Sequence, residues 1–165
     1  MTKLWDILKK KFVNENGIIS IGFSDIVGAG ISAGFWFYVA SVISPENYGE
    51  IHYFLGIAGL VQIVSMIGNS HSLTVYSAKK ESIQSTLFLL SIIPTIISCV
   101  IIGFLFNRID TGILALGYLV FESVNAVTLG KKFYSKYGKL IIIQKALTVI
   151  LGIGFLYGFG YEGII

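Results

Sequence analysis

Charged residues are scarce in this 165-residue chain, where Asp, Glu, Lys and Arg together make up only 13% of the sequence. A soluble domain carries about 25% charged residues, and half that supply cannot cover a water-facing surface. Hydrophobic residues make up 55% of the chain, and the mean hydropathy is +0.80. These values exclude an ordinary soluble protein and predict an integral membrane protein.

Residues that carry metal or redox chemistry are also few. The chain has one cysteine, Cys99, so neither a disulfide framework nor a CxxC metal site can form within it. The two histidines, His52 and His71, do not belong to an HExxH-like motif, and the phosphate-binding pattern GxxxxGK[ST] is absent. The sequence therefore predicts no metal site, no cofactor and no enzymatic activity.

Long apolar runs dominate what is present. A helix needs about 20 residues to cross a bilayer, and lipid leaves the backbone no other way to satisfy its hydrogen bonds. Five runs are candidates, at about residues 18–43, 51–76, 83–106, 113–129 and 140–159; four fit this length, and the first, with 26 residues, can tilt or extend past the interface. The sequence thus predicts an all-α, polytopic transmembrane helix bundle over residues 17–165, with five spans and the start of a sixth.

Lysine and arginine are distributed unevenly between the two predicted sides of the membrane. Ten lysines precede the first span or lie in the second and fourth connections, at positions 3, 9, 10, 11, 79, 80, 131, 132, 136 and 139. The opposite side has only Arg108, together with Glu46, Glu50, Asp110 and Glu162. The excess of cations on one side predicts a cytoplasmic N-terminus in a multi-pass protein of the cytoplasmic membrane. It accounts for the net charge of +3 without a nucleic-acid partner.

Residues 1–16 have an amphipathic pattern. Leu4, Trp5, Leu8 and Phe12 recur at helical spacing, with lysines mostly on the other face. This pattern predicts a short helix on the anionic cytoplasmic leaflet. A solvated basic tail is the alternative.

Three ionisable residues fall inside predicted spans, where each costs roughly 2.5–3.5 kcal/mol and is by default a functional candidate. At about 1.5 Å per residue, Asp25, Glu122 and Lys145 all lie in the cytoplasmic third of the bilayer. Asn125 shares a helical stripe with Glu122, and Gln144 precedes Lys145. We predict that these five residues line a conduit for a substrate or an ion. A Glu122–Lys145 ion pair, or a Lys145 side chain that extends to the surface, is the structural alternative.

Glycines suggest where helices approach or break. Gly30 and Gly34 form a GxxxG pattern, which predicts a close helix contact in the first span. Residues 68–72 interrupt the second apolar run, and two interpretations stay open: an unwound polar patch, or a helix that leaves the membrane.

Three segments resemble polysaccharide-exporter flippases of the multidrug/oligosaccharidyl-lipid/polysaccharide superfamily. They are Ile43–Glu50 (ISPENYGE) between the first two spans, Gly68–Val75 (GNSHSLTV) at the end of the second, and Gly160–Ile165 (GYEGII) at the entry to a sixth. The resemblance implies a transporter that moves a lipid-linked oligosaccharide or polysaccharide precursor across the membrane. Because Lys145 is the only cation inside a span, it is the candidate for the anionic head of the substrate.

Members of that family have two pseudo-symmetric helical lobes around a central cavity. With five spans, the chain corresponds to an N-terminal lobe, whose expected partners are the bilayer, the glycan substrate, and the remaining lobe or glycan-synthesis proteins. Alternatives are a non-transporting membrane subunit or truncated fragment associated with polysaccharide biosynthesis, and a drug or lipid II exporter of the same superfamily.

Overall fold

The computed structural model describes the backbone of residues 2–164, and the side chains of residues 17, 19–161, 163 and 164. The predicted amphipathic pattern over residues 1–16 lies outside the described side chains. In chain order the elements are α1 (Thr2–Val42), α2 (Pro45–Ser65), α3 (Asn69–Ala78), α4 (Gln84–Phe106), α5 (Ile109–Gly130), α6 (Tyr134–Phe159) and the 3-10 helix η1 (Tyr161–Ile164). The described residues contain no strand, which confirms the predicted all-α class.

Four helical segments are long and apolar enough to cross a membrane. They are Ile19–Val42 within α1, Gln84–Phe106, Ile109–Gly130 and Tyr134–Phe159. The pair α2 and α3 meets the same test only when the two helices are taken as one span, which is bent by 54°. The chain is therefore a helical membrane protein, as its composition predicts.

A sharp bend separates α2 from α3. Gly68 adopts a positive φ of 72°, which glycine reaches without the steric cost that a Cβ would add. Asn69 begins α3, and its Nδ2 donates hydrogen bonds to the carbonyl oxygen of Leu87 at 3.3 Å and to Ser91 Oγ at 2.7 Å. The predicted break at residues 68–72 is thus a bend between two helices, and the second helix is fastened to α4.

The start of α2 shows why the helices extend beyond the apolar runs. Ser44 is the N-cap residue, its Oγ accepts a hydrogen bond from the Asn47 N–H at 3.3 Å, and Pro45 occupies the first turn. Serine at the cap followed by proline is a favourable helix start, because proline lacks an N–H that would go unsatisfied there. Polar residues after Pro45 therefore belong to α2 rather than to a loop.

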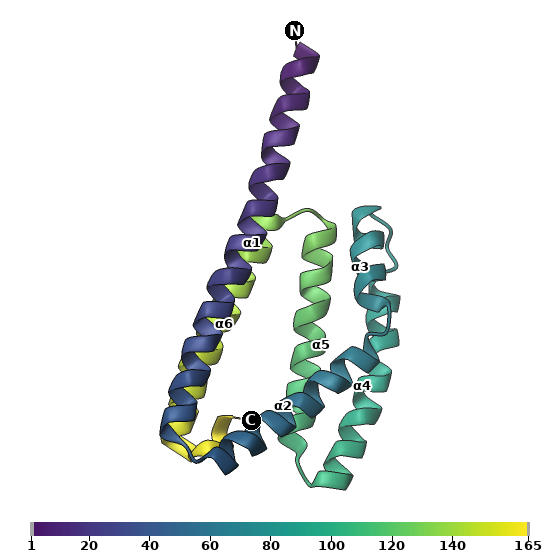
Figure 1. The fold of residues 1–165 in the computed structure, drawn as a ribbon. Helices are drawn as coiled ribbons and strands as arrows, with labels where there is room; N and C mark the ends of the chain where they lie inside the picture. Colours follow the sequence, from purple (N-terminus) through teal and green to yellow (C-terminus); the bar gives the residue numbers. More distant parts are fainter. Residues whose placement is uncertain (1, 165) are drawn as a thin grey trace.

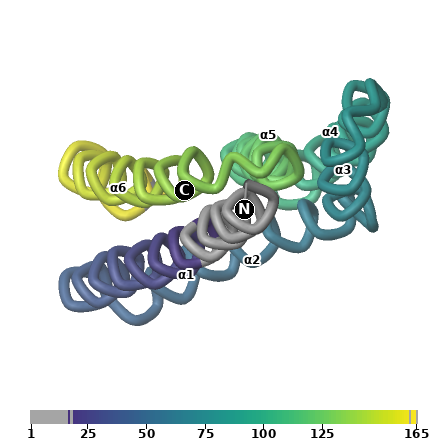
Figure 2. The backbone as a smooth tube through the Cα atoms, turned by 90° about the horizontal axis from the view of Figure 1, so that it is seen from above, coloured from purple at the N-terminus to yellow at the C-terminus, as the bar shows by residue number. Residues whose placement is uncertain are grey.

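The helices form two groups. In the first, α1 packs along α6; in the second, α4 packs along α5, and α3 also lies against α5 (Figures 1 and 2). Figure 1 shows α2 running obliquely from the end of α1 to the second group. Buried apolar side chains gather in the second group, around Met66, Leu73, Leu119 and Ala126. Contacts between α5 and α6 are sparse, so the two groups are joined mainly by connections and by α2.

The predicted close contact at Gly30 and Gly34 is wrong. Among the described atoms, none beyond their own helical surroundings lies within 4 Å of a Cβ built at either position. The close approach of α1 to α6 instead uses Gly138, which lies against Ser24, and Gly152, where a Cβ would lie 2.6 Å from Phe35 Cζ. A GxxxG pattern permits close packing, but the facing helix decides which glycines are used.

Lysines gather at one end of the bundle. The α3–α4 and α5–α6 connections share that end, and the α1–α2 and α4–α5 connections share the other (Figure 1). Lys79, Lys80, Lys131 and Lys132 lie in the first pair of connections, and all four are exposed. The fold therefore places these four lysines on the common side that their order in the sequence predicts.

Arg108 is neutralised at the opposite end. Its guanidinium lies 3.1 Å from Asp110 Oδ2 and 3.7 Å from Glu50 Oε1, and its Cζ lies 4.6 Å from the centre of the Phe54 ring. These contacts tie the start of α5 to α2.

Candidate functional site

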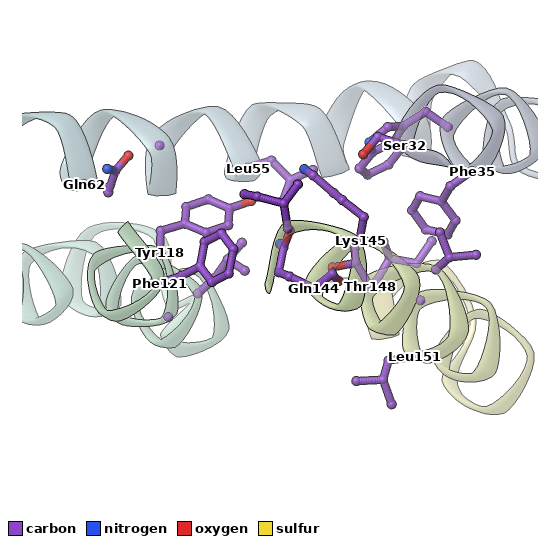
Figure 3. Close-up of a pocket in the computed structure, with 18 of the residues that line it drawn as sticks. Ser32, Phe35, Leu55, Gln62, Tyr118, Phe121, Gln144, Lys145, Thr148 and Leu151 are labelled. Carbon is purple, nitrogen blue, oxygen red and sulfur yellow. The ribbon is translucent and has the colours of Figure 1, made fainter. Parts of the chain in front are cut away.

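A cavity of about 1050 Å³ lies between the two helix groups. Its walls come from α1, α2, α5, α6 and η1. Aromatic and aliphatic side chains such as Phe35, Leu55 and Phe121 form part of the lining, and polar side chains project among them (Figure 3). A mostly apolar cavity with a few polar groups is the usual form of a small-molecule or lipid site.

Two of the ionisable residues singled out in the sequence line this cavity. Glu122 comes from α5 and Lys145 from α6, and Figure 3 shows the Lys145 side chain extending from α6 toward α2. Among the described residues, the only salt bridges are those of Arg108, so the alternative Glu122–Lys145 ion pair is absent. The Lys145 ammonium group is consequently not neutralised by this carboxylate across the cavity.

Glu122 is linked to the bend in the second span. Ser70 Oγ, in the first turn of α3, donates a hydrogen bond to Glu122 Oε1 at 2.9 Å. Since the carboxylate also lines the cavity, this contact joins the cavity wall to α3.

Asn125 and Gln144 bring unsatisfied acceptors to the cavity. Both residues line it, and Asn125 Oδ1 and Gln144 Oε1 are buried without a hydrogen-bond partner among the described residues. Asn125 is only 6% exposed. A buried acceptor without a donor costs about 1–3 kcal/mol, so these two amides lower the stability of the cavity wall.

Asp25 lies near the cavity but is not among the residues that line it. Its side chain is exposed, and its Oδ1 accepts a long hydrogen bond from Tyr137 Oη at 3.5 Å. Tyr137 itself lines the cavity. The fold thus gathers four of the five predicted residues at one cavity and places the fifth one contact away.

Aromatic residues at the cavity extend the candidate set beyond the ionisable groups. Trp36 lines the cavity, and its ring lies 4.5 Å from that of His52 and 6.1 Å from that of Tyr48, centre to centre. In the sequence, these residues carry no signal beyond an aromatic position near a span end, because the pairing depends on how α1 meets α2.

Ser32 also lines the cavity, at the centre of Gly30-Ile31-Ser32-Ala33-Gly34, which matches the letters of the GxSxG nucleophile motif. That motif needs a strained strand-to-helix turn, whereas this segment lies inside α1. No histidine is among the cavity-lining residues. The segment therefore matches the motif in sequence but not in structure.

No metal site is found either: the described residues contain no cluster of His, Cys, Asp and Glu that could hold a metal ion.

Comparisons with protein-family models, with curated proteins and with solved structures found no match to this chain.

Proposed function

We propose that this bundle is one lobe of a transporter that moves a lipid-linked oligosaccharide precursor from the inner to the outer leaflet of the cytoplasmic membrane. The observation that carries the proposal is the cavity between candidate spans, which holds Lys145 without an ion pair to Glu122. Ionisable groups inside membranes usually mark a substrate or ion pathway. The three resembling segments of the sequence supply the substrate class.

The lining suits each part of such a substrate. The Lys145 ammonium can bind a phosphate, since charge-assisted hydrogen bonds to phosphate are among the stronger ones. Gln62 and Thr148 line the cavity with side chains that are not buried and can hydrogen-bond the hydroxyl groups of a sugar, and Leu55 and Phe121 offer apolar surface to a lipid chain.

The arrangement of the helices supports movement of the two groups against each other. Few contacts join α5 to α6, and α2 is the main element that links the two groups. Alternating access in transporters is largely rigid-body rocking of one bundle against another around a fixed site. In the proposal, the cavity is open to one leaflet at a time.

The orientation follows from the charges. With α2 and α3 counted as one broken span, the chain crosses five times, and the end that carries Lys79, Lys80, Lys131 and Lys132 faces the cytoplasm. Arg108, paired with Asp110, then lies on the outer side. The substrate would enter from the lysine-rich end.

Transport by the reconstituted full chain tests the proposal. The probe is a fluorescent disaccharide on a polyprenyl diphosphate, and dithionite outside the liposomes quenches only the molecules in the outer leaflet. We expect Lys145→Ala to slow the initial rate by about tenfold or more, because a hydrogen bond to a charged group contributes roughly 1.5–3 kcal/mol. Asp25→Asn measures whether the residue next to Tyr137 also contributes.

The matched control is Lys139→Ala, which removes the same charge from an exposed position outside the cavity lining. It is expected to transport like the unmodified chain. Equal rates for Lys145→Ala and Lys139→Ala would remove Lys145 from the site. A single lobe can bind its substrate without moving it, so a correctly inserted chain that neither moves nor binds the probe would favour a non-transporting subunit.

A further inference from the structure

The helices α3 and α5 end in the same way, and two consecutive lysines follow each of them. Lys79 and Lys131 are the C-cap residues of the two helices. Lys80 and Lys132 follow, and both have a φ of 60°. Positive φ is the left-handed conformation, which glycine adopts readily and a lysine adopts at a steric cost.

The hydrogen bonds at the two ends correspond one to one. At the end of α3, the Lys80 N–H donates to the Ser77 carbonyl at 3.3 Å, and the Glu81 N–H donates to the Tyr76 carbonyl at 3.1 Å. These two bonds define a Schellman motif, in which glycine is the usual residue at the position of Lys80.

At the end of α5, the Lys132 N–H donates to the Leu129 carbonyl at 2.9 Å, and the Phe133 N–H donates to the Thr128 carbonyl at 3.0 Å. The motif is therefore repeated, again with lysine in the glycine position. The repetition matters because neither helix cap requires a lysine there.

Close packing brings the two helix ends together. Gly130, the last residue of α5, has no Cβ, and one built there would lie 2.7 Å from Ser77 Cβ and against the Thr74 carbonyl oxygen. Figure 1 shows the ends of α3 and α5 side by side at the same end of the bundle. Two lysine pairs that are far apart in the sequence thus converge on one surface.

This surface is cationic, because four lysines lie in the two connections against one carboxylate, that of Glu81. All four lysines are exposed, and among the described residues none of them forms a salt bridge. A lysine in the last turn is favourable at a helix C-terminus, because the macrodipole is negative there. That effect accounts for Lys79 and Lys131, but it falls off beyond the terminus and does not account for strained lysines at the next position.

We propose that Lys79, Lys80, Lys131 and Lys132 form a binding site for the headgroup of an anionic phospholipid. The pair Lys131–Lys132 directly follows the candidate span Ile109–Gly130, and the end of a membrane span lies near the lipid headgroups. Clustered lysines at such a boundary attract acidic lipids. The site lies outside the cavity, and the proposal does not depend on transport.

The test uses native mass spectrometry of the full chain in zwitterionic micelles. The probe is palmitoyl-oleoyl phosphatidylglycerol, titrated against phosphatidylcholine with the same acyl chains. We expect Lys80→Gly/Lys132→Gly to lower the affinity for phosphatidylglycerol by about tenfold or more and to leave phosphatidylcholine unaffected. Glycine suits the left-handed position, so the melting temperature of this variant stays equal or rises, which excludes unfolding as the cause.

The control is Lys136→Gln/Lys139→Gln, which removes two charges from exposed positions at the start of α6 and is expected to bind like the unmodified chain. Phosphatidylglycerol affinity that is unchanged in Lys80→Gly/Lys132→Gly would overturn the site, and so would an equal loss in the control. Glycerol 3-phosphate is titrated as a soluble competitor. Displacement of the lipid at equal concentration would show a site for free phosphate groups and overturn the lipid assignment.

Discussion

At the scale of single residues, two buried asparagines differ in how their hydrogen bonds are satisfied. Asn69 donates to Ser91 Oγ and to the Leu87 carbonyl, whereas Asn125 Oδ1 receives no hydrogen bond among the described residues. Both side chains are less than one-tenth exposed, at 8% and 6%. The first therefore stabilises the bend between α2 and α3, and the second costs stability at the cavity.

This difference predicts opposite effects for one substitution. Asn125→Leu should raise the free energy of unfolding by about 1 kcal/mol, because it removes an unsatisfied acceptor. Asn69→Leu should lower the free energy of unfolding by about 1–2 kcal/mol, because this substitution removes hydrogen bonds that are satisfied. Unfolding in mixed micelles of increasing denaturing-detergent fraction measures both. A loss of stability in both variants would mean that Asn125 is satisfied in the folded protein.

At the scale of elements, small residues decide which helices touch. Gly130 lets α5 approach α3, and Gly138 and Gly152 let α6 approach α1. By contrast, a Cβ at Gly117 in the middle of α5 meets no described atom within 4 Å, although this residue also lines the cavity. A glycine inside a helix costs roughly 0.5–1 kcal/mol relative to alanine unless packing requires it.

Two glycines of α5 should therefore respond in opposite directions to alanine. Gly130→Ala is expected to lower the free energy of unfolding by about 1–3 kcal/mol, because the added methyl group meets the backbone of α3. Gly117→Ala should raise the free energy of unfolding by about 0.5–1 kcal/mol, because alanine has a higher helix propensity than glycine. The same micelle titration distinguishes them. Tolerance of alanine at Gly130 would show that the ends of α3 and α5 lie further apart.

The helix ends were only partly predictable. The apolar runs located the membrane-crossing segments, but α5 begins at Ile109 and α6 at Tyr134, before the apolar runs start. Capping residues and first turns are polar, so hydropathy alone does not include them. Likewise, the interruption at residues 68–72 was visible in the sequence, whereas the 54° bend depends on the contacts of Asn69 with α4.

At the scale of the whole molecule, charge separates the two ends of the bundle. Lysines occupy the α3–α4 and α5–α6 connections, and Arg108 at the other end is paired with Glu50 and Asp110. In cell membranes, the cation-rich side of a multi-pass protein faces the cytoplasm.

This asymmetry predicts the sidedness of labelling. Cys99→Ser removes the one native thiol, and serine can still donate to the Gly112 carbonyl that the Cys99 Sγ contacts at 3.1 Å. In that background, Asn107→Cys should react with a membrane-impermeant maleimide in intact cells, and Lys80→Cys only after permeabilisation. Mass spectrometry of the labelled chain gives the outcome. Reversed labelling would invert the proposed orientation, and labelling of both in intact cells would contradict a membrane-spanning bundle.

The sequence predicted which residues belong to the candidate site, and the tertiary structure decided which of them line the cavity. Depth along the predicted spans placed Asp25, Glu122 and Lys145 at similar heights; helical spacing added Asn125, and adjacency to Lys145 added Gln144. Height does not determine which way a helix is turned, so the sequence could not show that Asp25 lies against Tyr137 outside the cavity lining. Nor could it decide between an ion pair and separate side chains for Glu122 and Lys145.

The sequence by itself determined that this is an all-α membrane protein, which segments are apolar and on which side the lysines gather. Those properties follow from the transfer of each residue between water and lipid, which depends little on its neighbours. Only the tertiary structure decided that α3 and α5 end together, that Ser70 reaches Glu122, and that α1, α2, α5, α6 and η1 line one cavity. Such contacts depend on the shapes of facing side chains far apart in the chain, which no local pattern contains.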